Sequence, residues 1–135
     1  MTLRKENKSI REKLEKLLNN SYSKYSGYSV SAICVMNDDK EFNGVNVENA
    51  SYGATICAER VAITNAITAG YKKGDFKELN IMVKSEKIGT PCFECRQVIS
   101  EFFNEECLIK LYSSNEEKEY LVKELCPYPF SEENL

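Results

Sequence analysis

Hydrophobic positions recur along this chain with two different periods, and their alternation predicts helices separated by strands. Over residues 3–19 apolar side chains lie among charges at helical spacing, which predicts an amphipathic helix. Its apolar face would carry Leu3, Ile10, Leu14, Leu17 and Leu18. Two more helices are predicted, over 57–69 before Gly70 and over 93–103 after Pro91.

Runs of small, β-branched or apolar residues predict five strands, over 29–36, 41–47, 79–83, 107–111 and 118–122. The first two are joined by residues 37–40, whose Asn-Asp-Asp-Lys sequence is typical of a hairpin turn. Strands interleaved with helices favour a layered α/β sheet. The chain shows no internal repeat, low-complexity tract or linker, so we expect residues 1–135 to form one domain.

Composition narrows the classes of partner. The 135 residues are 42% hydrophobic and 29% charged, as in soluble globular proteins, and the net charge is −3. No Lys/Arg cluster could follow a phosphate backbone, which argues against a nucleic-acid partner. No apolar run is long enough to cross a bilayer, and the charged start does not read as a secretory signal. We therefore expect a cytoplasmic protein with no membrane partner.

Cysteine usage points to metal chemistry. The chain has six cysteines and no histidine, and without a signal peptide such cysteines indicate thiols or metal ligands, not a disulfide framework. Cys92 and Cys95, two residues apart, could be a redox pair or half of a structural zinc site. Cys57 also opens a predicted helix, and a third thiol favours zinc. Cys34 and Cys107 are expected in the core, and Cys126 stays open as a fourth ligand.

Three protein ligands would leave the fourth tetrahedral position of a zinc ion for water, as catalytic zinc sites do. Glu59, two residues after Cys57, could move protons beside the metal without binding it. Three thiolates give such a site a net negative charge, which two helix N-termini and Arg60 could compensate. The alternative for Arg60 is an ordinary surface charge.

Four ordered segments of the chain resemble the small cytidine deaminases of nucleoside salvage. They are residues 42–53, 56–60, 91–99 and 124–130. The resemblance implies a three-layer α/β/α sandwich around a five-stranded mixed β-sheet, one Zn²⁺ per subunit, and a homotetramer with sites completed by neighbouring subunits. It also implies that Cys57, Cys92 and Cys95 bind the zinc and that Glu59 is the proton shuttle.

The same resemblance implies the residues that bind substrate. Asn46 and Glu48 match a ribose-binding pair, and their spacing lets both side chains face one way at the end of a strand. On spacing alone, ordinary hydrogen bonds at a strand end explain them as well. Ala58 matches a backbone N–H that meets the pyrimidine carbonyl. Tyr28 stands where the family usually has Phe, so it adds a hydroxyl near the nucleoside.

Two further aromatic residues match positions near a subunit boundary. Phe130 corresponds to an aromatic that closes over a neighbouring subunit's site, and Tyr52 lies near the same boundary. Without the resemblance, core packing would explain each aromatic. The chain also departs from the family at Phe93, where a glycine is common, which makes the loop between two ligands bulkier.

The predicted function is zinc-dependent hydrolysis of free cytidine and 2′-deoxycytidine to uridine and 2′-deoxyuridine, with release of ammonia. One alternative is deamination of another cytosine-containing compound, such as a nucleotide, a polynucleotide or a modified analogue. A second alternative is a non-catalytic binding module stabilised by zinc, which requires four protein ligands on the metal.

Overall fold

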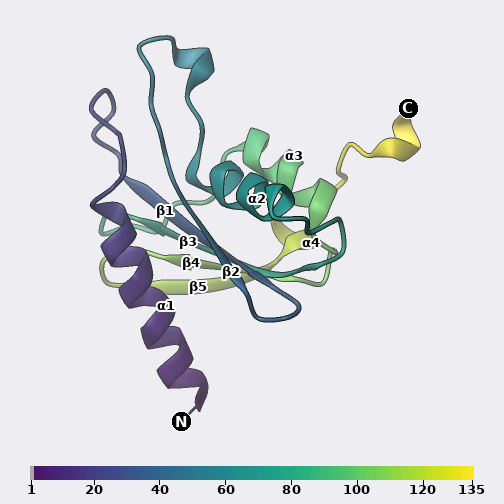
Figure 1. Cartoon of the computed structure of the whole chain (residues 1–135), viewed down its shortest axis with the longest axis horizontal. Coiled ribbons are helices and arrows are strands. Elements are labelled where there is room, and N and C mark those ends of the chain that lie inside the picture. Colours follow the sequence, from purple (N-terminus) through teal and green to yellow (C-terminus); the bar gives the residue numbers. More distant parts are fainter. Residues whose placement is uncertain (1) are drawn as a thin grey trace.

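The computed structural model describes residues 2–135, with side chains from Ser9 onward, so the predicted position of Leu3 lies outside the described side chains. Over the described residues the fold has four α-helices, five strands and two short 3-10 helices, Tyr52–Ala54 and Glu132–Asn134 (Figure 1). The helices are α1 (Thr2–Leu18), α2 (Ala58–Thr68), α3 (Phe93–Phe102) and α4 (Val122–Leu125). The strands are β1 (Val30–Met36), β2 (Glu41–Val45), β3 (Phe76–Val83), β4 (Leu108–Tyr112) and β5 (Glu117–Leu121).

The strands form one mixed sheet in the order β2-β1-β3-β4-β5. Only β3 and β4 are parallel, and the other neighbouring strands are antiparallel. The parallel pair is connected through α3, as a crossover between parallel strands requires. The predicted five-stranded mixed sheet is therefore confirmed.

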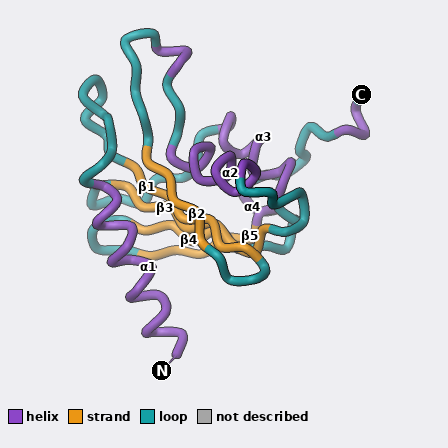
Figure 2. The backbone as a smooth tube through the Cα atoms, in the orientation of Figure 1, coloured by secondary structure: helices purple, strands orange, loops and turns teal. Residues whose placement is uncertain are grey.

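Helices cover both faces of this sheet, which gives the three predicted layers (Figure 2). On one face α1 buries Ile10 and Leu14 against Ile33, Val35 and Met82 of the sheet. On the other face α2, α3 and α4 enclose a larger apolar core. Both faces of the central strands are thus buried, which is why β1 reads as an apolar run and β3 is buried from Leu79 to Val83.

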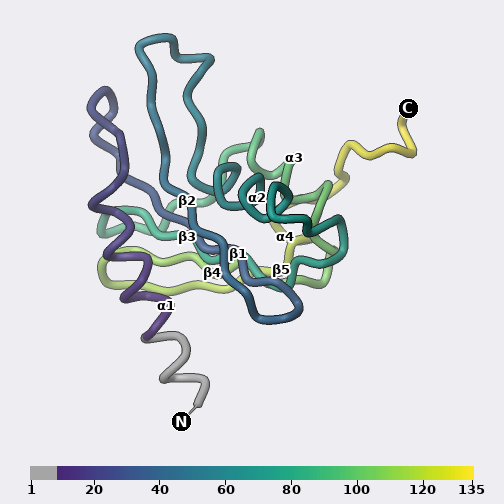
Figure 3. Tube along the Cα trace, viewed as in Figure 1, coloured from purple at the N-terminus to yellow at the C-terminus, as the bar shows by residue number. Residues whose placement is uncertain are grey.

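The N-terminal ends of α2 and α3 lie at the end of the sheet where the long loops project (Figure 3). Gly44 of β2 lets α2 come this close. A Cβ atom added at Gly44 would lie 2.3 Å from the carbonyl oxygen of Ala58 and 2.5 Å from the backbone nitrogen of Ala62. Strand β2 therefore sits against the first turn of α2, and this contact fixes the position of Cys57 and Glu59.

The structure differs from the sequence prediction mainly at the edges of elements. Strand β3 begins at Phe76, three residues before its predicted start, because its first residues pair with the end of β1. The structure also has a short helix, α4, directly after β5, where the sequence predicted none. Its first turn is capped by Glu124, whose carboxylate accepts a hydrogen bond from the backbone N–H of Leu121 at 2.7 Å. None of the helices described is both long and apolar enough to span a lipid bilayer.

Candidate active site

Three thiols meet where the two helices begin. Cys57 is the N-cap residue of α2 and Cys92 is the N-cap residue of α3, so both stand at helix starts as predicted. The Sγ atoms of Cys57 and Cys92 are 3.9 Å apart, and those of Cys92 and Cys95 are 3.5 Å apart. Sulfurs placed tetrahedrally about 2.3 Å from zinc would be about 3.8 Å apart, so the cluster has the size that a zinc ion requires.

The other three cysteines lie elsewhere. Cys34 is buried in β1, the thiol of Cys107 donates to the carbonyl of Phe76 at 3.4 Å, and Cys126 donates to the carbonyl of Arg96 at 3.5 Å. Within residues 9–135, the only metal-sized group of His, Cys, Asp or Glu is the trio of Cys57, Cys92 and Cys95. The described residues therefore supply three sulfurs and leave a fourth position open.

One cationic side chain, Arg60, lies beside this cluster. The guanidinium of Arg60 donates to the carbonyl of Thr55 at 3.2 Å and lies 3.9 Å from Cys57 Sγ. In the part of the chain with described side chains, its Nε is the one buried side-chain nitrogen or oxygen without a hydrogen-bond partner. A buried, unpaired N–H on the guanidinium that lies next to Cys57 fits a site whose sulfurs carry negative charge when metal is bound.

The thiols already differ in acidity. Hydrogen bonding with Cys95, assisted by Arg60, lowers the pKa of Cys57 to about 5. The pKa of Cys95 is raised, because its thiol donates to the Cys57 sulfur and is buried. Cys57 thus becomes a thiolate more readily than Cys95, and the thiolate is the form that binds metal.

Glu59 lies beside the thiols and is almost fully enclosed, with 5% of its surface exposed. Burial raises its pKa, and negative charge at Cys57 adds to the rise. The carboxyl group is therefore disposed to hold a proton as well as to release one. It lines a cavity of about 290 Å³ that also contacts Cys57, Ala58 and Cys92.

The same cavity extends to a polar region at the ends of β2 and β1. Asn46 and Glu48 both line it, so the predicted pair does face one way. The side chain of Asn46 is largely engaged: its Oδ1 accepts from Ser21 Oγ and from the N–H of Val30, and its Nδ2 donates to the carbonyl of Tyr28. One N–H of Asn46 is left for a ligand.

Glu48 holds the preceding loop in place. One carboxylate oxygen accepts from the N–H groups of Tyr25 and Ser26 at 3.0 Å each, and the other accepts from the Ser26 hydroxyl. These hydrogen bonds hold the pKa of Glu48 below its usual value, and those from Ser26 have the largest effect. Glu48 is therefore a fixed acceptor at the polar end of the cavity. The sequence analysis identified Glu48 but not Ser26.

Tyr52 and Phe130 do not reach this cavity within one chain. Tyr52 is 79% exposed and packs edge-on against Tyr25, with ring centroids 6.5 Å apart. Phe130 lies in the projecting tail, where its carbonyl accepts from Gln97 at 2.9 Å. Their predicted place at a neighbouring subunit's site stays a prediction.

One positioning residue was missed by sequence reasoning. Arg96 follows Cys95, the last cysteine of the cluster. It donates to the carbonyl of Pro91 at 2.8 Å and to that of Leu125 at 2.9 Å. Its guanidinium also lies over the ring of Phe93, 4.5 Å from the centroid. Arg96 thereby ties the loop that carries Cys92 to the end of α4. In the sequence, only its position directly after Cys95 pointed to such a role.

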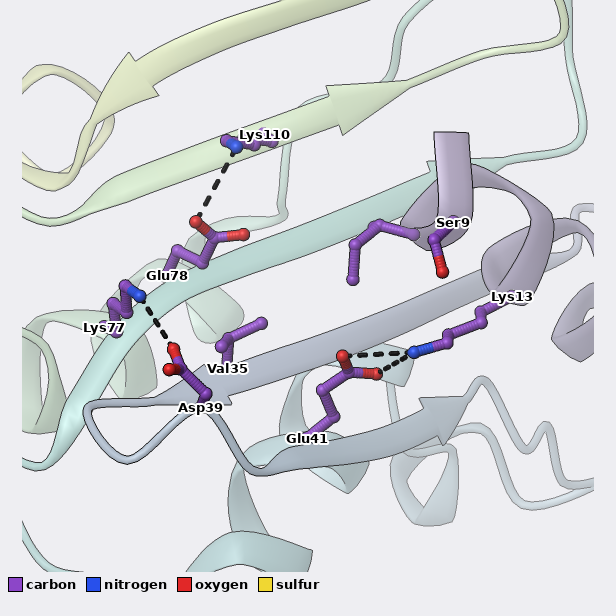
Figure 4. Close-up of a pocket in the computed structure, with 9 residues that line it drawn as sticks. Ser9, Lys13, Val35, Asp39, Glu41, Lys77, Glu78 and Lys110 are labelled. Atoms are coloured by element: carbon purple, nitrogen blue, oxygen red, sulfur yellow. Dashed lines mark hydrogen bonds and ion pairs between the residues drawn. The ribbon is translucent and has the colours of Figure 1, made fainter. Parts of the chain in front are cut away.

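A second cavity, of about 420 Å³, lies on the α1 face of the sheet, away from the thiols (Figure 4). Its lysines are paired with acids: Lys13 with Glu41 at 2.9 Å, Lys77 with Asp39 at 2.8 Å and Lys110 with Glu78 at 3.7 Å (Figure 4). No thiol or hydroxyl nucleophile other than Ser9 lines it. The smaller cavity at the thiols is therefore the candidate active site.

Comparisons with known proteins point to one family. The family model described as "Cytidine and deoxycytidylate deaminase zinc-binding region" matches residues 4–111. A cytidine deaminase of Sporosarcina psychrophila is 36% identical over 116 residues, which span 85% of this chain and 84% of that protein. One from Mycoplasma genitalium is 32% identical and covers 82% of each chain. The crystal structure of cytidine deaminase from Burkholderia pseudomallei has a TM-score of 0.84 and 35% identity, and covers 88% of this chain and 94% of that one.

Proposed function

Since the chain belongs to the family of cytidine and deoxycytidylate deaminases, we propose that its thiol-lined cavity hydrolyses free cytidine and 2′-deoxycytidine to uridine and 2′-deoxyuridine. The chain is a zinc-dependent cytidine deaminase, a hydrolase that acts on a C–N bond. The observation that carries the assignment of residues is a buried carboxylate, Glu59, beside three clustered thiols in one cavity with Asn46 and Glu48.

In this proposal Cys57, Cys92 and Cys95 hold one Zn²⁺ as thiolates, and Arg60 offsets part of their negative charge. When bound, zinc lowers the pKa of a coordinated water so that the water can act as a nucleophile near neutral pH. The N-termini of α2 and α3 point their partial positive charge at the sulfurs of Cys57 and Cys92, which further stabilises the thiolates.

Glu59 carries every proton that the reaction moves. Its carboxylate takes one proton from the attacking water and delivers it to N3 of cytosine as the C4–O bond forms. It then takes the remaining hydroxyl proton and gives it to the 4-amino nitrogen. That nitrogen leaves as ammonia when the C4–N bond breaks, and N3 keeps its hydrogen, as uridine requires. A buried carboxyl with a raised pKa suits both steps.

The polar end of the cavity fits a sugar. Glu48 offers an acceptor and Asn46 a donor, which together match one ribose hydroxyl. The N–H of Ala58, at the start of α2, is available to the pyrimidine carbonyl. No Lys or Arg is among the residues that line this cavity, so a phosphate has no counter-ion there and a nucleoside is favoured over a nucleotide.

Competing substrates test this assignment. The purified zinc-loaded protein would receive cytidine, 2′-deoxycytidine, cytidine 5′-monophosphate and cytosine at equal concentration, and products would be separated by chromatography. We expect the two nucleosides to be consumed first and the nucleotide and free base to remain. Preferential consumption of the nucleotide or the base would contradict the proposal.

Arg60→Ala is expected to lower turnover more than stability. A hydrogen bond to a charged group contributes about 1.5–3 kcal/mol, which corresponds to a loss of roughly 10- to 150-fold in rate. The matched control is Arg11→Ala, because Arg11 pairs with Glu117 on the opposite face of the sheet. Thermal unfolding and cytidine turnover should be measured for both variants. Unchanged turnover after Arg60→Ala would refute its role.

We also propose that the protein is a homotetramer whose sites are completed by neighbouring subunits. Large rings on the surface support this: Tyr52 is 79% exposed and Phe130 is 57% exposed. Aromatic side chains are enriched at the interfaces between protein chains. Light scattering should give the mass of four chains, and Phe130→Ala should raise the KM for cytidine. A fully active monomer would contradict the proposal.

The broader assignments are proposals of the same kind. Residues 1–135 are proposed as one deaminase domain, with no nucleic-acid or membrane partner, that serves pyrimidine salvage in the cytoplasm. The mildly acidic charge of −3 and the nucleoside-sized cavity support this reading. Cell fractionation followed by the cytidine assay tests the location, and activity confined to the membrane fraction would contradict it.

A further inference from the structure

The hydroxyl of Tyr28 has an unusual position in the cavity. Tyr28 lies two residues before β1. Its ring hydroxyl lies next to Gly89, in the loop that follows β3. Burial raises the pKa of Tyr28 and negative charge at Glu59 adds to the rise, so the hydroxyl stays neutral. Among the hydrogen bonds of the described residues, the Tyr28 ring hydroxyl takes part in none, although the backbone of Tyr28 makes two.

The loop around Gly89 has no room for a side chain because of this hydroxyl. A Cβ atom added at Gly89 would lie 2.4 Å from the Tyr28 oxygen and 3.1 Å from Cγ1 of Val83. The next ring atom of Tyr28, Cζ, would be 3.7 Å away, which is ordinary van der Waals contact. The hydroxyl oxygen, with Cγ1 of Val83 beside it, therefore fills the space between the ring and the loop.

The orientation of a bound base follows from the atoms that must react in the proposed function. C4 of cytosine must lie at the open position of the cluster, with N3 on one side and C5 on the other. N3 must face Glu59, which belongs to the wall formed by α2. C5 then points away from Glu59. Gly89 and Thr90, in the loop that leads to Cys92, also line the cavity, and the Tyr28 hydroxyl lies against Gly89.

We infer that the Tyr28 hydroxyl is a specificity determinant that excludes cytidines with a substituent at C5 of the base. The inference deepens the proposed function and depends on it for the orientation of the base. A methyl group at C5 would need the space that the hydroxyl oxygen occupies beside Gly89. Removal of that oxygen by Tyr28→Phe opens this space without changing the ring.

The test compares kcat/KM for 5-methylcytidine and cytidine in the zinc-loaded protein. One methyl-sized group in a pocket changes such ratios by roughly 10- to 200-fold, so we expect Tyr28→Phe to raise the ratio of 5-methylcytidine to cytidine by about tenfold or more. The matched control is Tyr25→Phe, in the same loop but outside the cavity lining, which should leave the ratio unchanged.

An unchanged ratio after Tyr28→Phe would overturn the inference, and so would a loss of cytidine turnover with no gain for 5-methylcytidine. The second result would show that the hydroxyl binds substrate. If the unaltered protein left cytidine intact, the proposed function itself would fail. The contact between the hydroxyl and Gly89 could then still be tested with a Gly89 variant, because that test measures stability and does not need turnover.

Gly89→Ala supplies this independent readout. The added methyl group meets the Tyr28 oxygen, so we expect the melting temperature to fall more in the unaltered protein than in the Tyr28→Phe background. Such coupling is the sign of two groups in direct contact. An equal fall in both backgrounds would show that the hydroxyl does not lie against Gly89, and would overturn the inference.

Discussion

Glu59→Gln is expected to lower cytidine turnover about 100- to 10,000-fold while zinc stays bound. The amide keeps the size of the side chain but cannot take a proton from water or hand one to N3. Since the same carboxylate serves both halves of the proposed reaction, we expect a loss toward the upper end of this range. Cytidine turnover and zinc content should be measured on the same preparation.

The chain contains a matched control for this change. Glu94 stands two residues after Cys92, just as Glu59 stands two residues after Cys57, and each lies in the first turn of its helix. The side chain of Glu94 is 79% exposed and does not line the cavity. It pairs with Arg60 at 3.6 Å, and an exposed ion pair of this kind contributes little. Glu94→Gln should therefore keep most of the activity. Substantial turnover in Glu59→Gln, or an equal loss in both variants, would contradict the role of Glu59.

Cys92→Ala is expected to remove both zinc and turnover. Zinc sites with four ligands are held by roughly 10–16 kcal/mol, so loss of one thiolate of three should weaken binding by at least about 3 kcal/mol, or about 100-fold. Cys92 is exposed, so its truncation leaves little cavity in the core and the fold should survive. Competition with a chelator gives the affinity, and circular dichroism checks the fold.

Two other cysteines make this experiment specific. Cys107→Ala changes a half-buried thiol outside the cluster and should leave zinc affinity unchanged. Cys126→Ala should do the same, because the Cys126 thiol donates to the carbonyl of Arg96 and is not part of the cluster. Loss of zinc after Cys126→Ala would indicate a four-sulfur centre and would favour a non-catalytic zinc module.

Local sequence patterns predicted the helices and strands well because each period reports the face that an element buries. The helix over 57–69 and the strand over 29–36 agree with α2 and β1 to within a residue or two. The start of β3 was missed, since Lys77 and Glu78 look like loop residues until β1 is present to pair with them. Such pairing joins residues that are far apart in sequence, so a local sequence pattern cannot reveal it.

The candidate site shows the same division. The three thiols could be grouped from their spacing and from the predicted helix starts. Spacing alone, however, makes Glu59 and Glu94 equal candidates for the proton carrier, since each follows a cysteine by two residues. Only packing separates them: Gly44 brings α2 against β2 and buries Glu59, whereas Glu94 faces solvent. The contact of Tyr28 with Gly89 joins residues 61 positions apart in sequence, so no local pattern contains it.

The most direct test of the central claim, that a zinc held by three cysteines works with Glu59 on a nucleoside, is an ultraviolet assay of cytidine loss on purified protein whose zinc content is measured in the same sample. We predict about one zinc per chain, rapid conversion of cytidine to uridine, and loss of activity in proportion to zinc removed by a chelator. A preparation that carries its full zinc and leaves cytidine unchanged would contradict the account.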